Sequence, residues 1–124
     1  MLTLSPAVRV FVAAEPIDLH LSFDRLAGLV RHPLRADPLS GHLFVFFNRT
    51  RTRTNIFAFD RNGYAIYYRR LERGTFQLPT VAKGVTRVEV DAAMLAMILE
   101  GIDLRTPRRL RFALDAEKSR VAQT

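Results

Sequence analysis

Hydrophobic and polar positions along the middle of the chain predict three consecutive β-strands. Apolar runs cover residues 42–47, 55–60 and 64–71, and each run has the length of a strand. Asn62 and Gly63 separate the last two runs, and both residues tolerate the positive φ of a type I′ hairpin turn. The first two runs are apolar at successive positions, which is typical of strands that are covered on both faces. We therefore expect them in the middle of an antiparallel sheet.

Two further stretches have helical patterning. Ser22 can cap a helix over residues 23–32, whose apolar side chains recur at helical spacing, and Pro33 would end it. Asp91 can cap a second helix over residues 92–99, which is apolar nearly all round. Such a pattern favours a helix that is buried on every side.

The order of these elements predicts an α+β fold. Apolar runs at residues 8–14 and 85–90 add a first and a last strand to the central ones. We predict a single domain with a mostly antiparallel sheet, a meander at residues 42–71, and two main helices at about 22–32 and 91–100.

Composition fits one domain of ordinary globular type. The chain has 124 residues, of which 48% are hydrophobic, so 1–124 can form a single core. A short extended piece is expected around Phe76, and residues 112–124 resemble a flexible tail. Cysteine is absent, and no uncharged apolar run approaches the roughly 18 residues that a membrane helix needs. We expect a cytoplasmic protein without a membrane segment.

Charge is distributed unevenly. The 19 Lys and Arg residues exceed the 12 Asp and Glu residues, which gives a net charge of +7. The residues up to Phe47 are balanced, so the whole excess lies beyond that position. Nearly all the basic residues are arginines, whose planar guanidinium suits bidentate contact with phosphate. The excess charge indicates either a nucleic-acid surface or ordinary solubilising charge, and GC-rich coding sequence would also enrich arginine.

Three groups of arginines are candidates for phosphate contact. The nucleic-acid-binding candidates are Arg49, Arg51 and Arg53; Arg69, Arg70 and Arg73; and Arg108, Arg109 and Arg111. On extended chain the first group would project from one face at a spacing of about 6.6–6.8 Å, although the same arginines could simply protect a sheet edge. Tyr67 and Tyr68 precede the second group and are candidates for base stacking, or for half-buried packing on the sheet.

No motif for catalysis or for cofactor binding is present. The three histidines lack metal-ligand spacing, and the six glycines form no phosphate-binding loop. Asp24, Asp60 and Glu100 could be combined into a metal-binding triad, but each also suits a helix end or a turn. We expect no catalytic residues, no metal and no cofactor, and therefore no enzyme.

Several blocks resemble a known family. They are Asp37-Pro-Leu-Ser-Gly-His-Leu-Phe-Val-Phe46, Asp60-Arg-Asn-Gly63, Tyr68-Arg-Arg-Leu-Glu-Arg-Gly-Thr-Phe76 and Leu99-Glu-Gly-Ile-Asp103. In this order they are similar to TnpB, the Orf2-like accessory protein of the bacterial insertion-sequence family sixty-six. The resemblance covers about residues 8–109. Many relatives carry a basic segment where this chain has residues 19–22, Leu-His-Leu-Ser.

The resemblance implies a role in transposition, beside an element-encoded transposase and a small companion protein. It implies no enzymatic activity of its own. Combined with the arginine groups, it predicts a non-catalytic accessory protein that binds DNA through arginine–phosphate contacts. The alternative is a protein-interaction module that bridges the transposase and its companion without touching DNA.

Overall fold

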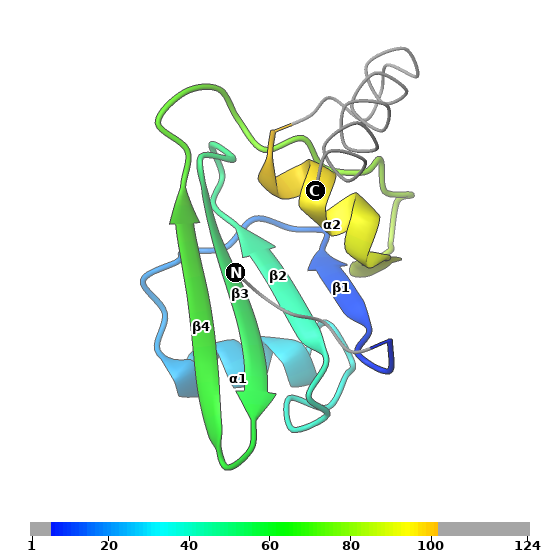
Figure 1. Ribbon diagram of the computed structural model, residues 1–124. Helices are drawn as coiled ribbons and strands as arrows, with labels where there is room; N and C mark the ends of the chain where they lie inside the picture. The colour runs from blue at the N-terminus through cyan, green and yellow to red at the C-terminus, as the bar shows by residue number, and fades with distance from the viewer. Residues whose placement is uncertain (1–5, 102–124) are drawn as a thin grey trace, which may run out of the picture.

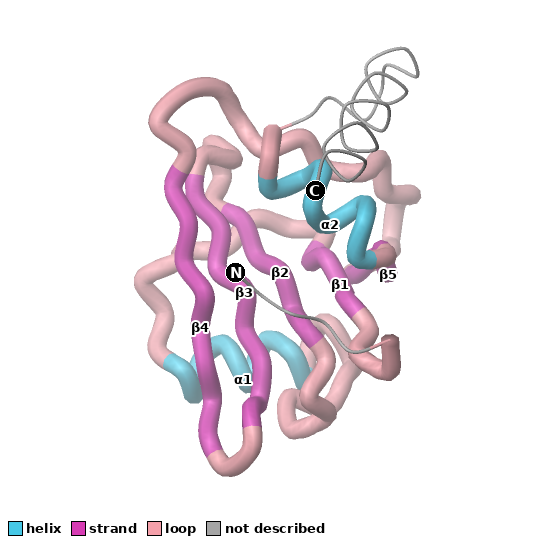
Figure 2. Tube along the Cα trace, viewed as in Figure 1, coloured by secondary structure: helices cyan, strands magenta, loops and turns pink. Residues whose placement is uncertain are grey.

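The computed structural model describes residues 6–101, which form a five-stranded sheet with one helix on each face. The strand order is β4-β3-β2-β1-β5 (Figure 2). The elements are β1 (Val10–Ala13), α1 (Phe23–Arg31), β2 (Leu43–Phe47), β3 (Arg53–Asp60), β4 (Gly63–Arg70), β5 (Arg87–Val90) and α2 (Ala92–Leu99).

The predicted antiparallel meander is confirmed. Strands β2, β3 and β4 are antiparallel neighbours, and both β2 and β3 lie inside the sheet rather than at its edge. Strand β1 pairs parallel with β2 and antiparallel with β5. A parallel pair needs a crossover connection, and α1 provides it between β1 and β2. The α+β prediction therefore holds, with one parallel pairing within the sheet.

Alternation of side chains along the central strands produces a core on each face of the sheet. Val45 and Phe47 of β2 belong to the core beside α2, whereas Phe44 and Phe46 belong to the core beside α1. All four are buried because the sheet lies between the two helices. Figure 1 shows α2 in front of the sheet and α1 behind it.

Both predicted helix caps are confirmed. The Asp91 carboxylate accepts a hydrogen bond from the Met94 backbone N–H at 2.7 Å, and the Ser22 hydroxyl accepts one from Arg25 at 3.4 Å. The expected burial of α2 on every side is only partly correct. Leu95 is buried and the helix packs on the sheet, but its three alanines are exposed in the described structure.

The hairpin between β3 and β4 forms, but its turn lies one residue earlier than predicted. Asp60 pairs with Gly63, so the loop consists of Arg61 and Asn62. Arg61 has a φ of 57°, while neither Asn62 nor Gly63 has a positive φ, so the predicted type I′ turn centred on those two residues is wrong. Strand pairing, rather than the preference of the Asn-Gly pair, determines which residues form the loop.

Phe76 anchors the long connection between β4 and β5. No strand forms around it in the described chain, so the expected extended piece is not a sheet element. Its ring is fully buried, with a centroid 5.3 Å from that of Phe47. Its backbone N–H donates to the carbonyl of Arg51 at 2.7 Å. This residue therefore attaches the connection both to the core and to the β2–β3 loop.

Candidate nucleic-acid interface

Asn48 organises the loop between β2 and β3. Its side-chain Oδ1 accepts hydrogen bonds from the backbone N–H groups of Thr52 and Arg53, each at 3.0 Å. Its Nδ2 donates to the hydroxyls of Thr50 and Thr52 at 3.1 and 3.2 Å. A short polar side chain that satisfies several loop groups in this way folds the loop into a compact turn.

This turn removes the extended row of arginines that the alternating sequence suggested. Arg49 lies in the turn, Arg51 has a φ of 58°, and of the three only Arg53 lies in a strand. The prediction that Arg49, Arg51 and Arg53 project from one face at regular spacing is therefore wrong. The hydrogen bonds between the Asn48 side chain and the loop backbone stabilise a turn here in preference to extended chain.

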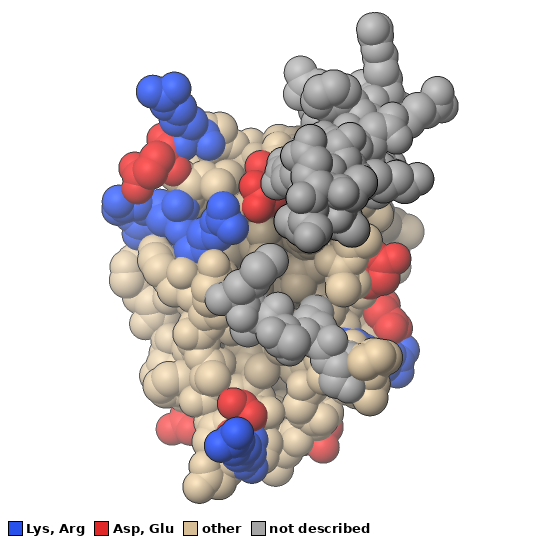
Figure 3. Space-filling view, viewed as in Figure 1, with Lys and Arg blue, Asp and Glu red and all other residues tan. Residues whose placement is uncertain are grey.

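Pairing of β3 with β4 brings the second group of arginines to the same end of the sheet. Arg53 pairs with Arg70, and Thr54 pairs with Arg69. Arg53 and Arg70 lie on one face of the sheet and Arg69 on the other, so the group surrounds this end of the edge strand rather than covering one face. Together with the β2–β3 loop and the residues after β4, they form what we call the arginine patch: Arg49, Arg51, Arg53, Arg69, Arg70 and Arg73. Figure 3 shows a group of basic side chains at this end of β4, at the upper left.

The arginine patch is only weakly neutralised. Arg70 forms an ion pair with Glu72 at 2.9 Å. The other five arginines form no ion pair with any carboxylate of residues 6–101. In addition, Arg53 and Arg70 are direct cross-strand partners, an arrangement in which like charges are destabilising. The patch therefore holds excess positive charge that an anion would stabilise.

Tyr67 and Tyr68 do not form a shared platform. Tyr67 pairs with Ile56, which faces the core beside α2, while Tyr68 pairs with Asn55 on the opposite face. Successive residues of a strand point to opposite faces, so the two rings cannot stack bases side by side. Both rings are exposed, and Tyr68 shares its face with Arg70. Base stacking on either ring alone stays a prediction.

A cleft of about 510 Å³ lies next to the arginine patch, where β1 ends. Its wall consists of the end of β1 with Glu15, of Arg51, and of the connection over residues 77–85 with Lys83. Sequence patterns did not reveal this cleft. Its walls come from three distant segments, which the pairing of β1 with both β2 and β5 and the Phe76–Arg51 hydrogen bond bring together.

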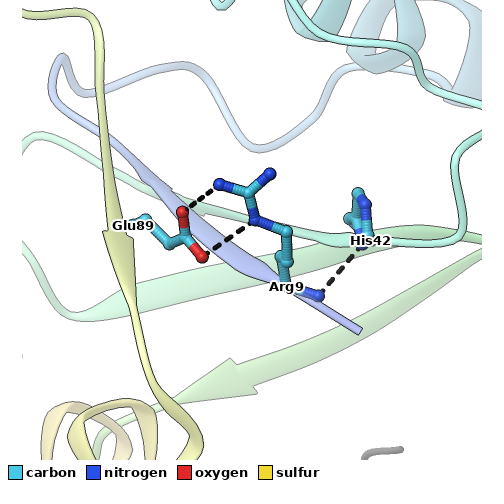
Figure 4. Close-up of polar contacts among 3 residues, drawn as sticks. All are labelled: Arg9, His42 and Glu89. Atoms are coloured by element: carbon cyan, nitrogen blue, oxygen red, sulfur yellow. Dashed lines mark hydrogen bonds and ion pairs between the residues drawn. The ribbon is translucent and has the colours of Figure 1, made fainter. Parts of the chain in front are cut away.

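A separate polar cluster lies at the other end of the sheet. The Arg9 guanidinium donates through Nε to Glu89 at 2.9 Å and through Nη2 to the other carboxylate oxygen (Figure 4). The Arg9 backbone N–H donates to Nδ1 of His42 at 3.0 Å. The hydrogen bond from Arg9, more than its charge, lowers the pKa of the Glu89 carboxyl below its ordinary value. This cluster connects β5 to β1.

Replacing Glu89 with glutamine is expected to lower the melting temperature at neutral pH but not in acid. The pKa of Glu89 in the folded protein lies below its ordinary value of 4.5. The ion pair therefore stabilises the fold above that pH, and its contribution is lost as the pH falls through the folded-state pKa. The effect is small because both side chains are exposed. Thermal unfolding of E89Q and wild type from about pH 7 to about pH 3 tests this, and a constant difference would contradict it.

The remaining candidate residues occupy helix ends or lie outside the described residues. Arg108, Arg109 and Arg111 lie outside the described residues. Asp24 lies in the first turn of α1, and Glu100 is the C-cap of α2. Within residues 6–101, no group of three histidine or carboxylate side chains is arranged to hold a metal ion. Neither helix in this part of the chain is long and apolar enough to cross a bilayer.

This chain is similar in sequence to a known protein family and to two proteins of one bacterial strain. The family model described as "IS66 Orf2 like protein" matches residues 8–109. The Sinorhizobium fredii (strain NBRC 101917 / NGR234) protein named "Uncharacterized protein y4hO" is 34% identical over 108 residues, covering 87% of this chain and 92% of the relative. "Uncharacterized protein y4jC" of the same strain is 28% identical over 109 residues, which cover 88% of this chain and 92% of that relative. No solved structure matches.

Proposed function

Because this chain belongs to the IS66 Orf2-like family of transposition accessory proteins, we propose that it binds the DNA backbone through the arginine patch. In this role it acts without catalysis of its own, beside the transposase and the small companion protein of the element. The DNA is held by guanidinium–phosphate contacts, which are charge-assisted and frequently bidentate.

The register of β3 against β4 is the observation that carries this proposal. It joins two arginine groups that are separate in the sequence, and it places Arg53 directly opposite Arg70. Folding two arginines against each other costs stability unless a negative charge compensates. Glu72 supplies part of that charge from beside Arg70, and a DNA phosphate would supply more. Arginines that only kept the protein in solution would not need to be brought together at one end of the sheet.

Sequence recognition is expected to be weak. Helices α1 and α2 each pack an apolar side on the sheet, and neither resembles a helix that presents side chains to base edges. Phosphate contacts fix position and orientation on the duplex but carry no direct sequence information. We therefore expect similar affinity for the terminal repeat of the element and for a scrambled duplex.

The triple change of Arg49, Arg53 and Arg69 to alanine is expected to weaken duplex binding roughly a hundredfold at low salt. Each arginine near a dense anionic surface contributes about 1 kcal/mol, and 1.4 kcal/mol corresponds to a tenfold change in affinity. None of the three has an ion-pair partner among the described residues, so the change breaks no ion pair there. Fluorescence anisotropy with a labelled duplex measures the effect.

The matched control changes Arg25, Arg31 and Arg61 to alanine. It removes the same number of positive charges, from three exposed arginines of α1 and of the β3–β4 turn, away from the patch, whereas Arg53 and Arg69 of the patch are half-buried. This variant should bind within a few-fold of wild type. An equal loss in both variants would indicate that net charge, and not the patch, holds the DNA. If wild type fails to bind at low salt, the proposal fails, and coprecipitation with the transposase after nuclease treatment tests bridging instead.

A further inference from the structure

We infer that the cleft at the end of β1 accepts one unpaired nucleotide of a DNA strand whose backbone lies on the arginine patch. This inference rests on the proposed function, since it needs DNA to be held at that patch. It goes further by assigning a preference for ends with a single-stranded overhang over blunt duplex.

The size of the cleft suits a ligand of this class. Its volume of about 510 Å³ lies within the range of roughly 300–1,000 Å³ that small-ligand pockets occupy. Its position also fits, because it opens beyond the carboxyl ends of the parallel strands β1 and β2. In α/β proteins, the corresponding edge of a parallel sheet is where ligands commonly bind, and β1 and β2 form the one parallel pair of this sheet.

The lining provides separate surfaces for a phosphate and for a base. Arg51 and Lys83 supply two positive charges for a phosphate. Glu15 supplies a carboxylate that can accept hydrogen bonds from a base and would repel a phosphate, so it fixes the orientation. Apolar side chains such as Leu78 and Pro79 line the same wall and can cover the face of a base.

A smaller hollow of about 70 Å³ lies beside the cleft and shares part of its lining. Asn48 and Arg49 line this hollow on the patch side. Arg51 and Glu15 line both the hollow and the cleft. A strand held on the patch can therefore pass its terminal nucleotide over Arg51 into the cleft.

The backbone of Arg51 is fixed in a conformation that residues with a Cβ rarely adopt. Its φ is 58°, its N–H donates to the Asn48 carbonyl at 3.1 Å, and its carbonyl accepts from Phe76 at 2.7 Å. Left-handed backbone outside glycine is uncommon and is concentrated at functional sites. Arg61 has a similar φ of 57° but lies in the β3–β4 turn at the other end of the sheet.

This similarity provides a matched pair of variants, Arg51→Gly and Arg61→Gly. Each removes one arginine and relieves one left-handed strain, so neither is expected to unfold the protein. Binding is measured to three labelled DNAs: a blunt duplex, the same duplex with a short overhang, and a blunt duplex lengthened by the same number of base pairs. The last controls for added phosphates.

Wild type and R61G are expected to bind the overhang duplex about tenfold more tightly than either blunt duplex, the contribution of about one charge-assisted contact. R51G should bind all three with similar affinity. If wild type binds blunt duplex without preferring the overhang, the cleft inference is overturned and the patch proposal stands. Equal weakening of all three DNAs in R51G would make Arg51 an ordinary backbone contact and overturn the inference. Failure to bind any of the DNAs overturns both proposals.

Discussion

Replacing Phe76 with alanine is expected to lower the free energy of unfolding by about 3–5 kcal/mol, the usual cost of removing a buried phenylalanine ring. The ring is fully buried in the core beside α2 and packs against Phe47. Its loss leaves a cavity beneath the long connection between β4 and β5. Because the same residue holds the Arg51 carbonyl through its backbone, the connection and the β2–β3 loop should loosen together. Urea denaturation followed by circular dichroism measures the change.

Phe23→Ala is the matched control for this prediction. Phe23 is the first residue of α1 and is 47% exposed, so truncating it removes little buried area. Its effect on the free energy of unfolding should stay below about 1 kcal/mol. If Phe76→Ala were as mild as Phe23→Ala, the connection over residues 77–85 would not depend on this anchor. The wall of the cleft would then need another explanation.

Raising the salt concentration from about 50 to about 200 mM is expected to weaken duplex binding roughly a thousandfold. About six phosphates contacted by the six arginines of the patch give a slope near −5 in a plot of log affinity against log salt, because each neutralised phosphate releases condensed counterions. A fourfold rise in salt then lowers the affinity by about three decades. The measurement is an anisotropy titration at several salt concentrations with the terminal-repeat duplex and a scrambled duplex.

The two triple variants are expected to differ in how steeply their affinity for DNA falls with salt. Arg49, Arg53 and Arg69 changed together to alanine should make the slope shallower by about three, since each lost phosphate contact removes about one. The control variant at Arg25, Arg31 and Arg61 should keep the slope of wild type. A wild-type slope near zero would mean that phosphate contacts do not hold the DNA, and it would contradict the arginine patch as the binding surface.

Local pattern alone determined the elements of this fold and much of their order. The apolar runs of residues 42–47 and 55–60, together with the caps Ser22 and Asp91, predict strands and helices that the structure contains. These signals are local because they depend on side-chain periodicity and on hydrogen bonds that reach only a few residues along the chain. The sequence also supported the family, since each block is a short local pattern and all of them fall within the residues 8–109 that the family model matches.

Tertiary structure decided where the arginines converge and what lies beside them. The alternation of Arg49, Arg51 and Arg53 suggested extended chain, but backbone N–H groups of the loop donate to Asn48 Oδ1 and fold it into a turn. The register of β3 and β4 places Arg53 opposite Arg70, a choice fixed by burial of one set of side chains on each face. The pairing of β1 with β2 on one side and with β5 on the other likewise creates the cleft from distant segments. Such long-range pairings depend on the packing of the whole core, which no short stretch of sequence contains.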